Sequence, residues 1–521
     1  MNYGREKLTE NTWGVSLTVK CKSEYRNYVL CLKSAHYSKQ ESIMTKKKRL
    51  FVFAAILLSF CVISARTNDK DVFKLRRLKA IDQLEENSIA VLRNSKRVIR
   101  NNDEEYFYRA NSNFFYLTGY EDPGSVLVLI PGTDPQFLLF VKPSNLRDAV
   151  WHGDLPGIDG AVRTYGADKA HELDQFPKML ISLVRNKDII YMDYDDRELY
   201  EMIVSNFPYR HGVVRPRQIN DLLPLIHEMR VYKGPEEIAL LTEAVRITCD
   251  GLAEVMKAFQ PGMYEYEAGA ILESVFKRNG SPRNGFTPIL GSGANATILH
   301  YQACNRKTNE GDLLLMDVGA EYGYYTADVT RTIPANGRFT KEQMEIYRIV
   351  LDAQKAGIKE MVPGKTFQTF LDAAEEVAKE GLFRLGLISD RNSKWQHLCY
   401  YFHQIGHWLG MDVHDVGDYG GRRNKKRVLE PGMVSTIEPG LYISENMRKS
   451  VFITRKVPED EIETFLEETK AAFEKYRDIG VRIEDDILVT EDGNRILSAG
   501  APREVEDIER MMEKKSIFNQ W

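Results

Sequence analysis

An aspartate inside an apolar run constrains the fold of this 521-residue chain more than any other feature. Residues 313–318 read LLLMDV, and such a continuous apolar segment is typical of a strand buried on both faces. Asp317 lies within it. An ionised carboxylate there is costly unless a cation or a metal ion compensates its charge. The segment therefore predicts a buried strand whose acidic group has a positively charged partner.

A hairpin brings a second aspartate close to the first. We expect the return strand at about 324–333, and a two-residue turn centred on Tyr322 and Gly323 would place Asp317 directly opposite Asp328. Side chains that face each other across two strands have Cβ atoms about 4.5–5.5 Å apart. Two carboxylates at that separation repel unless something positive lies between them. The alternatives are a shared divalent cation and two turn aspartates that point to water.

A histidine-rich segment follows. Three of the ten histidines, His403, His407 and His414, lie in HQIGHWLGMDVH beside glycines that permit close backbone approach. The spacing of His403 and His407 is that of the zinc-protease motif H-E-x-x-H, but Gln404 stands where that motif has its general base. This excludes a zinc protease of that kind, and each histidine taken alone is open to a packing role.

Two glutamates lie at expected strand positions. Glu438 follows the apolar segment 433–437 and precedes a Pro-Gly pair, so we expect it where a strand ends at a turn. In VRIEDDI, alternation places Arg482, Glu484 and Asp486 on one face. Taken alone, this pattern is typical of an ordinary strand with one face in water.

Four carboxylates and one imidazole thus follow one another along the chain: Asp317, Asp328, His407, Glu438 and Glu484. They are the ligand types that a two-metal hydrolytic site needs. The surrounding motifs DVGAEYGYYTADVTRT, HQIGHWLGMDVHDVG, EPGMVSTIEPGLY and GVRIEDDILVT resemble those of the pita-bread metallopeptidases, most closely the Xaa-Pro aminopeptidases (aminopeptidase P). The resemblance extends from about Arg76 to about Met511, and includes YRANSNFFYLTGYEDPGSVLVLIPG and IHEMRVYKGPEEIALL.

The resemblance implies two divalent metal ions, most often manganese. Asp317, Asp328 and Glu484 would hold both ions, with the last two bridging them, while His407 and Glu438 complete one side. A carboxylate-rich site with one imidazole also accepts cobalt, iron or zinc.

The resemblance also implies roles around the substrate. His300 and His414 would contact the scissile amide and stabilise its tetrahedral intermediate, and His403 would line the proline pocket. Arg482 and Tyr442 would orient the carboxylates that bind metal.

Trp151 resembles an aromatic residue that closes the proline pocket in this family, often from a neighbouring subunit. The resemblance therefore implies a homo-oligomer. Judged alone, Trp151 would be a domain-packing residue.

The implied activity is the release of the N-terminal residue from peptide substrates that begin Xaa-Pro. Two metal ions would make hydroxide available near neutral pH for attack on the bond before proline. Glu438 would take up the proton and pass it to the leaving nitrogen. Because the proline nitrogen lacks an N–H group and fixes φ, such bonds need a dedicated pocket.

Four alternatives have different ligand or domain requirements. Prolidase, which cleaves only Xaa-Pro dipeptides, would share the ligands. Methionine aminopeptidase lacks the amino-terminal domain, and a creatinase-like enzyme would not need all five ligands. A pita-bread binding module without catalysis typically lacks ligands, whereas this chain has all five.

The expected fold class is α+β, with two domains that divide near 224–235. An aminopeptidase P amino-terminal domain at 67–225 would be mixed α/β, with strands at 125–130 and 137–141 and helices at 73–84 and 171–185.

A pita-bread catalytic domain would occupy 226–521, with helices packed on a curved antiparallel sheet. Its expected helices are 235–258, 264–279 and 341–361. An insertion at about 444–478, with a charged helix at 458–476, is either a lid over the site or a solvated surface helix.

The first residues predict export. Met44 precedes a basic segment, the apolar stretch 50–63 and the small residues Ser64 and Ala65, the pattern of a secretory signal peptide at 44–66. We expect residues 1–43 to be an upstream extension of the reading frame and the protein to be periplasmic or secreted. Membrane contact is expected only through an uncleaved signal segment.

Charge and cysteine content exclude two classes. The net charge is −4, and the basic excess lies in the first 50 residues, so no basic stripe for nucleic acid remains. The cysteines beyond the signal segment, Cys249, Cys304 and Cys399, are too few and too widely spaced for a disulfide framework.

Overall fold

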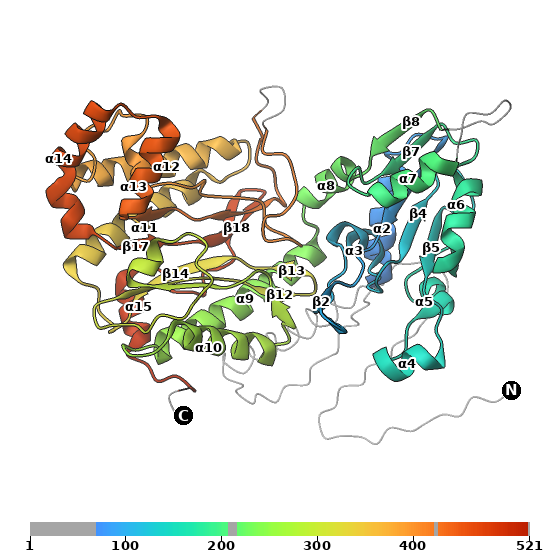
Figure 1. Cartoon of the computed structure of the whole chain (residues 1–521), viewed down its shortest axis with the longest axis horizontal. Helices are drawn as coiled ribbons and strands as arrows, with labels where there is room; N and C mark the ends of the chain where they lie inside the picture. Colours follow the sequence, from blue (N-terminus) through green and yellow to red (C-terminus); the bar gives the residue numbers. More distant parts are fainter. Residues whose placement is uncertain (1–68, 207–215, 421–425, 519–521) are drawn as a thin grey trace, which may run out of the picture. The chain divides into compact units, whose positions relative to one another are not determined.

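The computed structural model describes residues 69–206, 216–420 and 426–518 (Figure 1). The expected upstream extension and signal peptide, residues 1–66, lie outside this range. Among the described residues, no helix has the length and apolar character needed to cross a membrane. The three cysteines in the described chain, Cys249, Cys304 and Cys399, are free.

The first part of the described chain is built on a six-stranded sheet in the order β6-β5-β4-β1-β7-β8. Strand β4 is antiparallel to β1 and β5, and the other pairs are parallel. The strands are β1 Ser88–Arg93, β4 Val126–Leu129, β5 Phe137–Val141, β6 Lys169–Glu172, β7 Ile189–Met192 and β8 Gln218–Asp221. A small hairpin, β2 Ile99–Asn101 and β3 Glu104–Glu105, lies apart from this sheet.

Helices supply apolar side chains to both faces of this sheet. Alternate residues of β1 enter opposite cores: Ala90 and Leu92 pack with Phe114, whereas Ile89 and Val91 pack with Leu180. The helices are α2 Asp69–Ile81, α3 Ser112–Thr118, α4 Leu146–His152, α5 Gly157–Arg163, α6 Phe176–Val184, α7 Arg197–Asn206 and α8 Leu223–Val231, with a 3-10 turn η1 at Leu173–Gln175.

One expected helix of this part begins later than the sequence predicts. The sequence predicts a helix at 171–185, but residues 169–172 form the edge strand β6, which pairs with β5. The helix α6 starts only at Phe176, where a proline occupies its first turn. The strand at 137–141 is as predicted, and the helix at 73–84 runs from Asp69 to Ile81 instead.

The second part contains two successive units, each with a helix pair followed by antiparallel strands. The first has helices α9 Pro235–Ala258 and α10 Glu265–Arg278, followed by a sheet of β10 Ile289–Ser292, β11 Leu313–Val318 and β14 Val329–Pro334. Three short strands, β9 Arg283–Asn284, β12 Ala320–Tyr322 and β13 Tyr325–Thr326, form a second small sheet.

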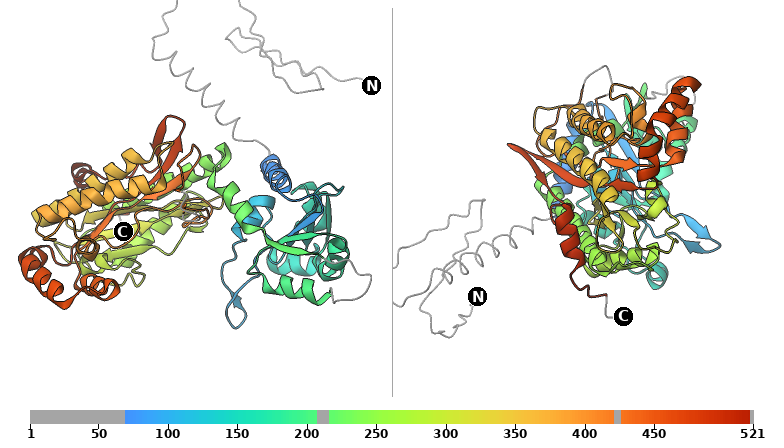
Figure 2. Two further views of the ribbon diagram at one scale, coloured as in Figure 1. Left: turned by 90° about the horizontal axis from the view of Figure 1, so that it is seen from above. Right: turned by 90° about the vertical axis from the view of Figure 1, so that its left-hand side faces the viewer.

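The second unit repeats this order. The yellow-orange helices α11 Lys341–Glu360 and α12 Phe367–Arg384 lie side by side (Figure 2). The strands are β15 Val434–Ile437, β16 Gly440–Tyr442, β17 Gly480–Arg482, β18 Asp485–Thr490 and β19 Gly493–Ile496, and helix α15 Val505–Met512 follows. Local signals define the helix starts, because Thr340 and Gln343 cap α11 reciprocally. The element order thus gives the expected α+β class, with helix pairs and antiparallel strands in the second part.

The register of the aspartate hairpin differs from the predicted one. Asp317 is opposite Thr330, and the turn consists of Gly323 and Tyr324, which have φ of 55° and 71°. Both central residues of a type I′ turn need positive φ, and glycine meets this at its first position. Asp328 therefore lies two residues from Thr330, diagonal to Asp317 on the same face.

The strand expected to have a wet face is buried and interrupted. Strand β17 ends at Arg482, and β18 begins at Asp485. The exposed fractions of Arg482, Glu484 and Asp486 are 3%, 1% and 0%. The backbone N–H of Glu484 donates to the carbonyl of Thr330 over 3.1 Å, so β14 runs alongside this segment, and Arg482 and Glu484 line a pocket rather than an open face.

The segment 444–478, which the sequence predicts as an insertion, forms two helices, α13 Glu445–Arg455 and α14 Glu459–Tyr476. Phe465 of α14 packs edge-on against Trp395 at 5.0 Å, and the Tyr476 hydroxyl donates to Glu345 of α11 over 2.5 Å. None of residues 444–478, all of which are described, lines the pocket presented below. This arrangement favours a surface helix over a lid.

Candidate active site

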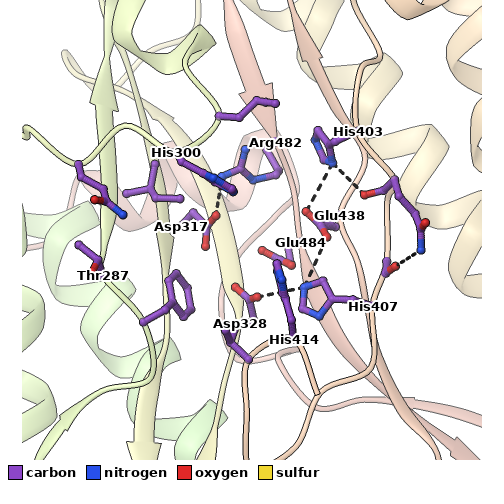
Figure 3. Close-up of a pocket in the computed structure, with 17 residues that line it drawn as sticks. Thr287, His300, Asp317, Asp328, His403, His407, His414, Glu438, Arg482 and Glu484 are labelled. Carbon is purple, nitrogen blue, oxygen red and sulfur yellow. Dashed lines mark hydrogen bonds and ion pairs between the residues drawn. The ribbon is translucent and has the colours of Figure 1, made fainter. Parts of the chain in front are cut away.

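One pocket of about 460 Å³ gathers most of the predicted site residues (Figure 3). Its walls come from both helix-strand units: Asp328 immediately precedes β14, Glu438 immediately follows β15, and β17 supplies Arg482. The predicted residues that line it are His300, Asp317, Asp328, His403, His407, His414, Glu438, Arg482 and Glu484.

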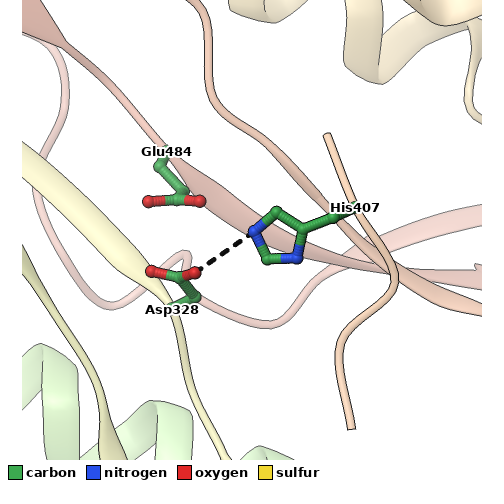
Figure 4. Close-up of side chains that lie close together, drawn as sticks. All are labelled: Asp328, His407 and Glu484. Carbon is green, nitrogen blue, oxygen red and sulfur yellow. Dashed lines mark ion pairs between the residues drawn. The ribbon is translucent and has the colours of Figure 1, made fainter. Parts of the chain in front are cut away.

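The tightest cluster is suited to a metal ion. One ligand atom each from Asp328, His407 and Glu484 lie within 4.8 Å of one another (Figure 4). His407 Nε2 lies 3.3 Å from Asp328 Oδ2 and 3.5 Å from Glu438 Oε1. Asp317 lines the same pocket, so the structure brings all five predicted ligands to one cavity.

Backbone pairing places His407 beside Glu438. The segment 405–408 runs along β15: the N–H of Thr436 donates to the His407 carbonyl, and that of Glu438 donates to the Ile405 carbonyl. A Cβ on Gly406 would lie 2.7 Å from the Thr436 carbonyl oxygen, so this close approach requires glycine. His407 Nδ1 lies 3.1 Å from the Trp408 carbonyl, which leaves Nε2 directed at the cluster.

Several buried carboxylate oxygens have no partner among the described residues: Asp317 Oδ1, Asp328 Oδ1, Glu484 Oε1 and Asp486 Oδ1. Burial, followed by the neighbouring carboxylates, raises the pKa of Asp328 and of Glu484 well above their ordinary values. Burial likewise raises the pKa of Glu438 to about 7. Bound cations would satisfy these oxygens and offset the repulsion, so the donor set fits divalent metal ions.

Arg482 helps to fix the positions of the carboxylates through hydrogen bonds. Its guanidinium donates to Asp317 over 2.5 Å, to the Tyr442 hydroxyl over 2.8 Å and to the Thr330 hydroxyl over 3.2 Å. Thr330 in turn donates to Glu484 over 2.7 Å. Sequence reasoning missed Thr330; the correct hairpin register, which places it opposite Asp317, would have found it.

A directed chain of hydrogen bonds extends from Arg482 to His403. The Tyr442 hydroxyl accepts from Arg482 and lies 2.8 Å from His403 Nε2, while His403 Nδ1 lies 2.9 Å from the Gln404 carbonyl. Burial and the nearby Arg482 lower the pKa of His403 to about 4, so the ring is neutral. Its Nδ1–H then donates to Gln404, and its Nε2 accepts from Tyr442.

The two remaining histidines line the pocket from irregular segments. The ring of His414 lies 4.2 Å from that of His407, and burial lowers the pKa of His414. His300 follows the 3-10 turn η2 Gly293–Thr297 and is exposed at the pocket rim. Their predicted contacts with substrate stay predictions.

Trp151, unlike most of the predicted site residues, does not line the pocket. It lies in α4 with 77% of its surface exposed, outside the pocket that the described residues form. The domain-packing interpretation is therefore wrong, whereas a contact with substrate from a neighbouring subunit stays a prediction.

The sequence assigns no site role to the rest of the lining. Phe286, Thr287, Ile289, Leu299, Gln302, Gln404, Gly406 and Val413 complete the pocket. These residue types are common in any core or loop, and no motif distinguishes them before the fold is known.

Comparisons with known proteins agree with this geometry. The model of metallopeptidase family M24 matches residues 239–491, and that of the aminopeptidase P N-terminal domain matches residues 73–191. The chain is 36% identical to Xaa-Pro aminopeptidase of Escherichia coli over 452 residues, which are 84% of this chain and 97% of that protein. The chain belongs to metallopeptidase family M24. The predicted resemblance is thereby confirmed.

Solved structures of family M24 show the same fold. Aminopeptidase PepP of Pseudomonas aeruginosa matches with a TM-score of 0.77 and 36% identity, over 85% of this chain and 98% of that one. Aminopeptidase P of Escherichia coli with the inhibitor Pro-Leu matches with a TM-score of 0.76, 36% identity and the same coverage. These relatives are Xaa-Pro aminopeptidases, so prolidase is not favoured.

Proposed function

We propose that this M24 enzyme is a metal-dependent exopeptidase that releases the N-terminal residue from peptides with proline in the second position. One observation carries the proposal: four carboxylates and His407 line a single pocket, and buried carboxylate oxygens there lack a partner among the described residues. The match to Xaa-Pro aminopeptidase over 97% of its length supports the proline specificity.

The five predicted ligands would hold two divalent cations: Asp317, Asp328, His407, Glu438 and Glu484. When bound, the cations would lower the pKa of a water molecule, so that hydroxide is available near neutral pH, and would polarise the substrate carbonyl. We propose manganese, because carboxylate oxygens predominate and only one imidazole contributes.

The side chains of the pocket would then handle protons and charge. Glu438 faces the cavity beside His407 and would take the proton of the attacking water to the leaving proline nitrogen. His414 and His300 would donate hydrogen bonds to the oxygen on which negative charge develops. His403, neutral and already bonded to Tyr442, would present its ring to the proline side chain.

A peptide assay tests this function. The purified protein with added manganese should cleave Xaa-Pro-Yaa tripeptides, should leave Xaa-Ala-Yaa peptides intact and should lose activity on chelation. Free proline released only from Xaa-Pro dipeptides would instead indicate prolidase. No hydrolysis with manganese, cobalt, iron or zinc would indicate a binding module.

We further propose that the protein is exported through a cleaved signal segment at 44–66, with an amino-terminal domain at 67–225 and a catalytic domain at 226–521. The basic and apolar pattern of the segment supports export. N-terminal sequencing of the exported protein tests this, and a mature chain that still contains 50–63 would contradict it.

We also propose that the protein is a homo-oligomer, because three large apolar side chains of α4 are exposed: Leu146 by 88%, Val150 by 81% and Trp151 by 77%. Sedimentation of the purified protein tests this proposal.

A further inference from the structure

His300 lies on a loop without regular structure. The loop leaves η2 at Thr297 and reaches β11 only at Leu313. Between these two elements, the described chain forms one isolated β-bridge, which pairs Lys307 with Tyr264. His300 itself is exposed, so burial of its own side chain does not fix it at the pocket.

A single buried carboxylate organises this loop. Glu265 is the first residue of α10, and its exposed fraction is 0%. Oε1 accepts from the Ser292 N–H over 2.7 Å, the Ser292 hydroxyl over 2.7 Å and the Asn295 amide over 3.2 Å. Oε2 accepts from the Tyr301 hydroxyl and the Arg306 N–H, both over 2.9 Å. All five partners are donors, as an ionised carboxylate requires.

These contacts hold both ends and the middle of the segment 292–306. The backbone N–H of Glu265 also donates to the Arg306 carbonyl over 3.0 Å, which closes the segment on the start of α10. The positive end of the helix dipole favours the negative charge there. A buried, fully hydrogen-bonded carboxylate of this kind makes the loop conformation rigid.

Tyr301 connects this carboxylate to His300, its neighbour in the chain. Its ring packs on the apolar cluster that contains Ile289 and Tyr442. Asn305 Oδ1 is a more distant acceptor for the Tyr301 hydroxyl, at 3.4 Å. Burial and the bond to Glu265 raise the pKa of Tyr301, so the phenol keeps the proton that it donates.

We propose that Glu265 is a positioning residue that holds His300 at the active site through Tyr301. The inference rests on the proposed function, in which His300 contacts the substrate. The proposal requires a carboxylate at the start of α10, outside the metal-binding motifs. Five donors of the loop point at this position, and only a carboxylate offers them two oxygens that both accept.

Two conservative variants test it with manganese-loaded protein and an Xaa-Pro-Yaa peptide. Glu265→Gln keeps the shape but turns an NH2 group toward donors, so kcat should fall about tenfold to a hundredfold at unchanged metal content. Tyr301→Phe removes one bond and should lower kcat several-fold, about threefold to tenfold, with little change in KM. The matched control is Tyr266→Phe, on the same helix and 53% exposed, which should behave as the unmodified protein.

A double-mutant cycle with His300→Ala separates positioning from general structure. If Tyr301 acts through His300, Tyr301→Phe should have no further effect on kcat in the His300→Ala background. An equal loss in both backgrounds, or no loss from Tyr301→Phe alone, would overturn the inference. The cycle decides even if Glu265→Gln fails to fold.

The cycle also distinguishes two kinds of failure. Full activity of His300→Ala would overturn the inference, while Xaa-Pro cleavage by the unmodified protein would leave the proposed function in place. Absence of cleavage by the unmodified protein would instead refute the proposed function itself.

Discussion

Two groups of buried carboxylates in this protein differ in how their charge is balanced. Asp415 lies between Arg230 at 2.5 Å and Lys233 at 3.0 Å, and all three side chains are buried. In the active site, Asp328 and Glu484 are equally buried, but each keeps an oxygen without a partner among the described residues. The chain thus supplies its own cations to one group and leaves the other deficient in positive charge.

The pKa values reflect this difference. Burial alone would raise the pKa of Asp415, but Lys233 and Arg230 keep it below its ordinary value. At Asp328 and Glu484, burial and neighbouring carboxylates raise the pKa well above that value. A buried cluster of this kind is stable only with bound protons or added cations, which supports a divalent-metal site in this pocket.

The largest expected effect comes from removing a ligand of the deficient group. Asp328→Asn should lower kcat/KM by about a thousandfold or more, because the metal ions that activate water are lost. Peptide hydrolysis and elemental analysis of the purified variant measure this. In chelator, the same variant should be at least as stable as the unmodified protein, since a buried repulsion is removed; a less stable metal-free variant would contradict the comparison.

A substitution in the charge-balanced group around Asp415 should instead lower the stability of the protein. Asp415→Asn leaves Arg230 and Lys233 buried without their shared carboxylate, and the free energy of unfolding should fall by about 3–5 kcal/mol. Urea unfolding measures it. Asp159→Asn, in an exposed pair with Arg163, is the control and should change stability by less than about 1 kcal/mol. Equal effects of the two substitutions would mean that Asp415 is not a structural ion pair.

The metal-free protein should lose stability as pH rises. The folded pKa of Glu438 is raised to about 7, so the folded state holds a proton that the unfolded state has already released. Its contribution is full below about pH 4.5 and is lost through pH 7, a change of about 3 kcal/mol. Melting of chelated protein at pH 5 and pH 7.5 measures it. Glu438→Gln should remove this part of the pH dependence; an unchanged profile would contradict the assignment.

The smallest expected effect concerns orientation of a ligand. Thr330→Val removes the hydroxyl that donates to Glu484 and accepts from Arg482, and metal affinity should weaken about tenfold. Titration of metal-free protein with manganese measures it. Thr332→Val is the matched control, because that hydroxyl bonds only to backbone groups of Arg482 within the described chain. A similar loss in both variants would indicate general disruption of β14.

The sequence predicts the ligand types well and their arrangement less well. Asp317 is recognisable because a charged residue interrupts an apolar strand, and Glu438 because a turn follows it. The hairpin register was wrong because turn residues with positive φ, here Gly323 and Tyr324, are decided by local backbone geometry. Thr330 depended on that register and was missed with it.

Other misses have tertiary causes. Alternation in VRIEDDI cannot reveal that the polar face is enclosed by the tertiary fold, so it predicts a wet face for Arg482, which is 3% exposed and lines the pocket. His171 and Glu172, predicted as the start of a helix, belong to strand β6 because β5 offers an edge to pair with. Glu265 belongs to no motif, and only the folded loop shows its five donors.

The helices α13 and α14 join the rest of the fold at two neighbouring points of one strand pair. Tyr442 and Gly480 are paired across β16 and β17, so the intervening residues 443–479 leave and return at neighbouring points of one ladder. Lengthening a connection between ends that are already fixed adds little closure entropy. Residues on the exposed face of α14 can therefore vary without altering this ladder, whereas Met447, which packs in one cluster with Tyr442, and Phe465 and Phe473, which belong to the main core, must keep their packing.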